Sequence, residues 1–219
     1  MARKSSVPRV RAAGPRAVPL PPGNVRPNPR GDLPRIAPSA FVDPTALVIG
    51  NVRIGPRTFV GPNAVLRADE PDSSGRVAPV EIGDACNVQD GVILHALGGT
   101  SVTIGPRSSL SHGCIVHGPC DVGRGCFIGF RAVVFGARLA DGVMVGAGAI
   151  VQSAEVPPNR LVPPGTAILS SESAAALPAT GPDERTFMDK VVAANLGLVT
   201  AYRGRAGEGR RQRPTATQS

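Results

Sequence analysis

The chain has 219 residues, a formal net charge of +8 and only 3% aromatic residues. Most of the charge lies at the ends: residues 1–35 contribute +7 and residues 203–219 contribute +4, so the body between them carries −3. Nucleic-acid binding needs a basic groove with stacking aromatic side chains, which this body lacks, and no apolar run is long enough to span a membrane. We therefore expect neither nucleic acid nor a membrane as a partner.

Residues 1–35 are predicted to form a disordered, basic, proline-rich tail. They hold eight Lys or Arg against one Asp, and seven prolines precede Gly31. Such a composition cannot bury enough apolar surface to fold alone, and it contains no apolar run typical of a signal peptide. A basic organellar presequence is the alternative, although so many prolines disfavour its amphipathic helix. We expect a cytoplasmic protein.

The body repeats with a period of six residues. An aliphatic residue recurs at every sixth position, glycine often follows it, and a small residue comes four places after it. The aliphatic positions before the first register slip are Ile36, Val42, Val48, Ile54, Val60, Leu66, Ile82, Val88, Leu94, Ile104, Leu110, Val116, Val122 and Ile128. After a slip near Val133 and Val134, and another before Val156, the series runs on to Ile168.

Each six-residue unit is expected to form one short strand and a turn, with its aliphatic side chain pointing into a narrow prism. Three units make one coil, and stacked coils bury a continuous core that a single unit could not. The 21 units counted in this way predict an all-β solenoid of about seven coils over residues 36–169.

Two insertions interrupt the repeat, and a different pattern follows it. Residues 71–79 and 97–101 are predicted loops. Residues 170–203 are predicted to form a linker and one C-terminal α-helix packed alongside the prism, with Asp183 as its cap. The residues at helical spacing in this segment are Phe187, Val191, Asn195, Leu198 and Tyr202. The Arg- and Gly-rich residues 204–219 are predicted to form a second disordered tail.

All four cysteines occupy the small-residue position of the repeat. They are Cys86, Cys114, Cys120 and Cys126. Their side chains are therefore expected to point inward, where free cysteine behaves as a small buried hydrophobe. We predict neither a disulfide nor a cysteine metal site.

Two of the three histidines are predicted to stack on one outer face. His95 follows Leu94 directly, His117 follows Val116 directly, and both side chains should project outward. They are 22 residues apart, which is three repeats, or one full coil, once the four-residue insertion after His95 is set aside. Their backbones should lie about 4.8 Å apart, and Arg67 should share their column.

His112 lies on a neighbouring face, above Gln89, so its imidazole cannot easily join the other two within one chain. It can join them if a second copy packs its Gln89/His112 face against the Arg67/His95/His117 face of the first. A three-sided prism making such a heterologous contact suits a closed trimer. Three neutral imidazoles with an open fourth position are typical of catalytic zinc and also suit iron or cobalt.

At these residues the chain resembles the gamma-class carbonic anhydrases, which are hexapeptide-repeat proteins with a left-handed parallel β-helix. The matching segments, in order, are LRADE (66–70), NVQDGVILHAL (87–97) and LSHGCIVHGP (110–119). The resemblance runs from about Phe41 to Tyr202. It implies a homotrimer with a metal ion at each subunit interface, held by His95 and His117 of one chain and His112 of the next.

The resemblance also implies an activity, the reversible hydration of CO2 to bicarbonate by a metal-bound hydroxide. Arg67 matches a residue that contacts bicarbonate, and Asp69 matches its interface partner. Glu70 and Gln89 match the catalytic carboxylate and the amide that orients the hydroxide. Asn87 matches a further polar neighbour, and Asn195 matches an amide that holds the substrate.

The chain departs from the best-known family pattern at one point. That pattern has an acidic loop after the first histidine, with a glutamate that carries protons, whereas this chain has Gly98 and Gly99 there. Glu70 is the remaining candidate for proton transfer; a purely structural ion pair with Arg67 is the alternative. A non-catalytic carbonic anhydrase-like scaffold subunit and a hexapeptide-repeat acyltransferase remain as alternative functions.

Overall fold

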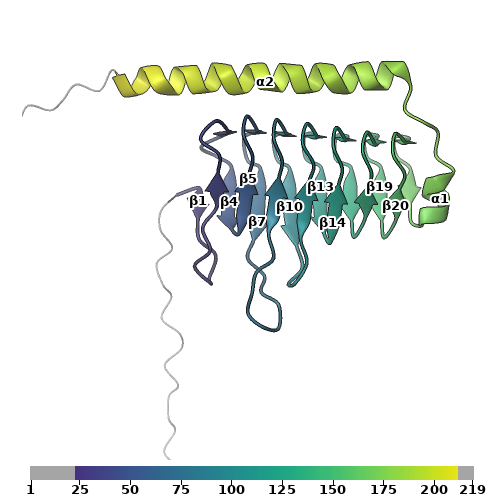
Figure 1. Ribbon diagram of the computed structural model, residues 1–219, viewed down its shortest axis with the longest axis horizontal. Helices are drawn as coiled ribbons and strands as arrows, with labels where there is room; N and C mark the ends of the chain where they lie inside the picture. The colour runs from purple at the N-terminus through teal and green to yellow at the C-terminus, as the bar shows by residue number, and fades with distance from the viewer. Residues whose placement is uncertain (1–22, 212–219) are drawn as a thin grey trace, which may run out of the picture.

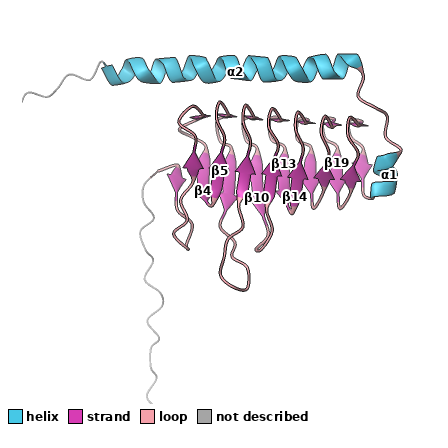
Figure 2. Cartoon of the chain, in the orientation of Figure 1, coloured by secondary structure: helices cyan, strands magenta, loops and turns pink. Residues whose placement is uncertain are grey.

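The computed structural model describes residues 23–211, and it describes side chains up to residue 204. Its strands form three parallel sheets that are the three walls of a prism (Figures 1 and 2). Sheet A comprises β1 (Val25–Arg26), β4 (Leu47–Gly50), β7 (Val65–Ala68), β10 (Ile93–Ala96), β13 (Ile115–Gly118), β16 (Val133–Phe135), β19 (Ile150–Gln152) and β22 (Ala167–Ile168).

The other two walls have seven strands each. Sheet B comprises β2 (Arg35–Ile36), β5 (Val52–Ile54), β8 (Val80–Ile82), β11 (Val102–Ile104), β14 (Cys120–Val122), β17 (Arg138–Leu139) and β20 (Glu155–Val156). Sheet C comprises β3 (Phe41–Val42), β6 (Phe59–Val60), β9 (Asn87–Val88), β12 (Ser109–Leu110), β15 (Phe127–Ile128), β18 (Met144–Val145) and β21 (Leu161–Val162). The chain visits the sheets in turn, which confirms the predicted parallel β-solenoid of about seven coils.

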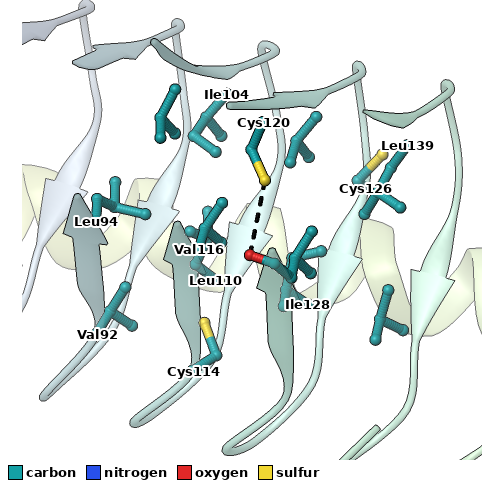
Figure 3. Packing of buried hydrophobic residues seen from close by; sticks show 14 of the residues in the cluster. Val92, Leu94, Ile104, Leu110, Cys114, Val116, Cys120, Cys126, Ile128 and Leu139 are labelled. Carbon is teal, nitrogen blue, oxygen red and sulfur yellow. Dashed lines mark hydrogen bonds between the residues drawn. The ribbon is translucent and has the colours of Figure 1, made fainter. Parts of the chain in front are cut away.

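The repeat determines which side chains enter the prism. The aliphatic residues of the repeat, Leu94, Leu110, Val116 and Ile128 among them, are fully buried and stack coil upon coil (Figure 3). The small-residue position is also buried, as predicted, and the four cysteines there are free. Burial raises the pKa of the Cys114 thiol to about 12, because a thiolate cannot be solvated there.

Tight turns join sheet C to sheet A, and two of them carry residues that matter below. Gly91 follows Asp90 with φ +67°, and Gly113 follows His112 with φ +69°. This left-handed backbone conformation favours glycine, which lacks the Cβ that would be crowded there. The two glycines therefore turn the chain sharply and leave the preceding side chains, Asp90 and His112, at the corner of the prism.

Two helices follow the last coil. The short α1 (Ser171–Ala175) falls in the predicted linker, and α2 (Pro182–Arg211) runs antiparallel to the coil stack over sheet C (Figure 1). The predicted cap, Asp183, is wrong: Pro182 is the first helical residue, and Glu184 Oε2 accepts from Gly181 N at 2.8 Å. This is one half of a capping box, with proline at the first helical position, where it fits best.

The buried face of α2 is rotated slightly from the predicted one. Its buried residues are Met188, Val192, Asn195 and Val199. Phe187 and Tyr202 are exposed in the single chain, yet they contact Phe127 and Phe41 of sheet C, with ring centroids 5.2 and 4.7 Å apart. Leu198 is exposed. Helical spacing alone does not determine which of these residues face the prism.

The predicted domain limits need correction at both ends. Residues 23–35 belong to the fold, because β1 pairs with β4 (Val25 with Val48) and Asn28 Nδ2 donates to Ala68 O at 3.1 Å. At the other end α2 continues to Arg211, beyond the predicted limit at 203. The rest of the two predicted tails, residues 1–22 and 212–219, lies outside the described residues. None of the helices in the described part is both long and apolar enough to cross a bilayer.

Candidate metal centre

The outward side of sheet A carries the predicted histidine column. His95 of β10 pairs in register with His117 of β13 on one side and with Arg67 of β7 on the other. The next residue in the column is Phe135 of β16, whose ring contacts the His117 ring edge-on at a centroid distance of 5.4 Å. The strand register thus stacks Arg67, His95 and His117 in one column, as predicted.

The two imidazoles converge through one nitrogen each. His95 Nδ1 lies 3.1 Å from His117 Nε2. The other nitrogens face acceptors: His117 Nδ1 lies 3.1 Å from Gly118 O, and His95 Nε2 lies 3.4 Å from a carboxylate oxygen of each of Asp69 and Glu70. This arrangement suits the tautomers with an N–H on each nitrogen that faces an acceptor, which would leave lone pairs on the two facing nitrogens for a metal ion.

Three charged residues surround this pair at the end of β7. Asp69 bridges two groups, because Oδ2 accepts from Arg67 Nη1 at 3.2 Å while Oδ1 faces His95. Glu70 does not pair with Arg67, contrary to the structural alternative considered for it. Its Oε2 accepts instead from Gly98 N at 3.2 Å, and its Oε1 faces His95.

The surroundings keep His95 neutral. Its pKa is lowered, first by burial and then by the Arg67 guanidinium, and this outweighs the carboxylates of Glu70 and Asp69, which raise it. A neutral imidazole is the form that binds a metal ion. His95 is 7% exposed, and within the described chain its Nε2 has no well-aligned hydrogen bond.

His112 lies apart from this pair, at the corner between sheets C and A. Its neighbours differ from the prediction: the register pairs Leu110 with Val88, so His112 stacks over Asp90, and Gln89 lies beneath Ser111. The prediction was off by one residue because it placed a turn residue on the face of a strand. His112 Nδ1 lies 3.3 Å from Asp90 Oδ2, and its ring stacks on Phe130 with 5.8 Å between centroids.

Gln89 lies beside α2 and contacts it through Asn195. Its Nε2 donates to Asn87 Oδ1 and to Asn195 Oδ1, each at 2.8 Å. Asn195 in turn donates through Nδ2 to Val191 O at 2.8 Å. The three predicted amide residues therefore meet in one cluster between sheet C and α2, on the His112 side of the molecule.

The two facing nitrogens fit a metal ion bound between them. Two nitrogens that bind one tetrahedral zinc ion at about 2.0–2.1 Å lie about 3.3 Å apart, close to the observed 3.1 Å. Each histidine directs one ring nitrogen at an acceptor and leaves the other free, as metal-bound histidines do. Among the described residues of one chain, no three His, Cys, Asp or Glu side chains cluster closely enough to hold a metal ion.

Sequence reasoning missed several contacts around the histidines. Asp90 and Phe130 lie one coil below and one coil above His112, and Phe135 lies one coil above His117, so counting along the repeat would have found them. The contact of Gly98 with Glu70 has no such signal, because it depends on how the two inserted loops pack. A Cβ at Gly98 would lie 2.4 Å from Pro71 O, so the close approach of the loops requires glycine.

Comparisons with known proteins agree with the motifs. A family model described as "Hexapeptide repeat of succinyl-transferase" matches residues 51–96 and 119–153. A carbonic anhydrase from Methanosarcina thermophila is 34% identical over 197 residues, which cover 80% of this chain and 77% of that protein. The chain belongs to the gamma-class carbonic anhydrase family. The resemblance inferred from the three segments is thereby confirmed.

Two further similarities bear on the range of functions in this gamma-class family and fold. The carboxysome assembly protein CcmM of Nostoc sp. is 37% identical over 178 residues, which cover 77% of this chain. This chain spans only 31% of the length of that CcmM protein. A solved hexapeptide transferase family protein from Anaplasma phagocytophilum superimposes with a TM-score of 0.61 at 25% identity, covering 80% of this chain and 96% of that one.

Proposed function

We propose that this gamma-class protein is a carbonic anhydrase that hydrates CO2 reversibly at metal sites between the subunits of a homotrimer. The observation that carries the proposal is the His95–His117 pair, with facing nitrogens 3.1 Å apart and outer nitrogens directed at acceptors. Zinc is the first candidate metal, and iron or cobalt would suit the same ligands.

The outer surface of sheet A supports the proposed trimer. Beside the histidine column runs a second outward column that is entirely aliphatic, formed by Leu47, Val65, Ile93, Ile115, Val133, Ile150 and Ala167. Ile93 and Ile150 are 39% and 40% exposed in the single chain. A continuous apolar column of this kind favours burial against another protein surface. A second copy packed there would bring its own His112 corner toward His95 and His117.

Each polar residue near the histidines has a role in this proposal. A bound zinc ion would lower the pKa of its water ligand to about 7, making a nucleophile available at neutral pH. Gln89, arriving with His112 from the adjacent subunit, would accept a hydrogen bond from the reacting water and orient it. Arg67, half exposed beside the pair, would attract the bicarbonate anion, and Asp69 would hold the Arg67 guanidinium in place.

Glu70 is the residue proposed to move the proton. Its Oε1 faces His95, while the Glu70 side chain is 43% exposed in the single chain and so reaches both the site and the solvent. The N–H of Gly98 holds the other oxygen, Oε2. A carboxylate fixed in this way can take a proton at Oε1 and release it to buffer, which is the task of the acidic loop that this chain lacks.

A non-catalytic scaffold is the second candidate, favoured by the similarity to carboxysome assembly proteins. It would keep the sheet A contacts without needing the arrangement of Gln89, Asn195 and Glu70. The acyltransferase alternative has less support, because an acyltransferase needs one histidine as a base and not two with converging nitrogens. Its remaining support is the shared hexapeptide fold.

The deciding experiment measures metal content and CO2 hydration on the same purified sample. The protein is reconstituted separately with zinc, cobalt or ferrous iron under anaerobic conditions, and the trimer is verified by light scattering. We expect one metal ion per chain and hydration activity that disappears with a chelator. A fully metallated trimer without activity would favour the scaffold, and a monomer with full metal content would contradict the shared site.

A further inference from the structure

The amides of Asn87, Gln89 and Asn195 form a hydrogen-bonded chain whose direction is fixed at one end. Val191 O is a backbone carbonyl and can only accept, so Asn195 must present Nδ2 to it. Asn195 Oδ1 is then the atom that faces Gln89, and Gln89 must present Nε2 in return. The second hydrogen on Gln89 Nε2 goes to Asn87 Oδ1.

This arrangement leaves Gln89 with one free polar atom. Both N–H groups of its amide are used inside the subunit, and no group in the described part of the chain donates a hydrogen bond to Gln89 Oε1. If the Gln89 amide turned over, Oε1 would face Asn195 Oδ1 and Asn87 Oδ1, so acceptors would meet acceptors at 2.8 Å. The cluster therefore holds the Gln89 amide in a single orientation, in which Oε1 is the acceptor left free.

We propose that Asn195 is a positioning residue, which fixes the polarity of Gln89 and does not hold the substrate. This rests on the proposed CO2 hydration, and it differs from the role that the family resemblance implies for Asn195. Asn195 is 6% exposed, and both ends of its amide are already bonded, one to Val191 and the other to Gln89. The helix α2 thereby contributes to the site through Gln89.

A double-mutant cycle separates positioning from substrate holding. Gln89→Ala is expected to lower kcat by on the order of a hundredfold, as when one oriented hydrogen-bonding group is lost. Asn195→Ala should lower kcat by a similar or smaller factor with little change in KM, and it should have no further effect in the Gln89→Ala background. Multiplicative losses, or a rise in KM confined to Asn195→Ala, would overturn the proposal.

Two substitutions at Asn195 sharpen the test. Asn195→Asp keeps an acceptor toward Gln89 Nε2, whereas Asn195→Leu has a similar shape and no polar atom. If Asn195 positions Gln89, Asn195→Asp should retain several times the kcat of Asn195→Leu. If Asn195 donates a hydrogen bond to bicarbonate, the aspartate should be the worse of the two, because its charge repels the anion. That ranking would contradict the proposal.

A readout independent of activity keeps this inference separable from the proposed function. Neutron diffraction on crystals of the metal-loaded, deuterium-exchanged trimer locates the amide deuterons directly. We expect the two deuterons of Gln89 Nε2 to point at Asn87 Oδ1 and Asn195 Oδ1. One deuteron of Asn195 Nδ2 should point at Val191 O. Deuterons of Gln89 directed outward would overturn the inference, even in an active enzyme. The expected pattern in a trimer without hydration activity would instead contradict the proposed function alone.

Discussion

Sheets A and B share one core but present different outer surfaces. Both contribute aliphatic residues of the same repeat to the prism, and the residues next to these point outward. On sheet B the outward column is polar and mostly charged: Arg35, Arg53, Glu81, Thr103, Asp121, Arg138 and Glu155. On sheet A the two outward columns are aliphatic and histidine-bearing.

The difference indicates what each wall faces. The charges on sheet B are partly paired, as in Arg53 with Glu81 and Arg138 Nε with Asp121 Oδ2 at 3.7 Å, and they suit contact with water. The aliphatic column on sheet A gains by leaving water. Because the repeat constrains only inward positions, the outward residues are free to specify the partner of each wall. The predictions below test whether sheet A alone carries assembly and metal binding.

The largest effect is expected from removing a ligand. His117→Ala should lose metal and hydration activity together, and no buffer should restore them. His112→Ala should do the same, because each site would take His112 from the adjacent chain. Metal analysis and activity on both purified variants measure this directly. A His112→Ala protein that kept its metal would contradict the shared site.

Mixing the two variants tests the division of ligands between chains. If sites are shared, refolding equal amounts of His112→Ala and His117→Ala together should restore about a quarter of the sites, those where an intact pair meets an intact His112. A mixture of His95→Ala with His117→Ala should restore none, since that pair must come from one chain. Equal recovery in the two mixtures would show that the ligands are divided differently.

The next largest effect concerns assembly. Ile150→Lys places a charge in the aliphatic column of sheet A, two strands away from His117 along the stack. We expect monomers by light scattering and loss of the metal, although every ligand is present. The control is Thr103→Lys on sheet B, between Glu81 and Asp121, which should remain a metal-loaded trimer. Dissociation of both variants, or of neither, would contradict the contrast between the walls.

A smaller effect is expected at Glu70. Glu70→Gln can still accept a hydrogen bond from Gly98 N but has no carboxylate, so the metal should stay bound while kcat falls by about a hundredfold. Imidazole buffer should restore part of the rate, because an external base can replace a positioned one. Glu81→Gln on sheet B is the matched control and should be silent. An unchanged rate for Glu70→Gln at low buffer would make Glu70 structural.

The sequence was sufficient to predict the features that follow from the six-residue repeat. Stacking of His95 on His117 followed from counting coils, and burial of the cysteines followed from their position in the unit. Features outside the repeat could not be predicted from the sequence in this way. The hydrogen-bond partner of Glu70 depends on how two inserted loops pack, and the buried face of α2 depends on how the helix packs on sheet C. Val25 belongs to the fold because its backbone pairs with β4, which its proline-rich surroundings did not indicate.

The smallest predicted effect compares two cysteines of the shared core. Cys126 Sγ donates to Ala140 O at 3.2 Å, and Ser108, at the same repeat position, donates to Gly123 O at 2.8 Å. Cys126→Ser should therefore be nearly neutral, because the hydroxyl finds a ready acceptor. Cys114 is fully buried and its thiol has no such contact among the described residues, so Cys114→Ser should lose about 1–3 kcal/mol of unfolding free energy.

Urea unfolding of the metal-free proteins measures the stability of both cysteine variants. Before the metal is removed, each variant should hold a full complement of it. Equal losses at the two positions would show that the carbonyl contact contributes nothing, and loss of metal from an intact trimer would show that the thiols do not serve packing alone.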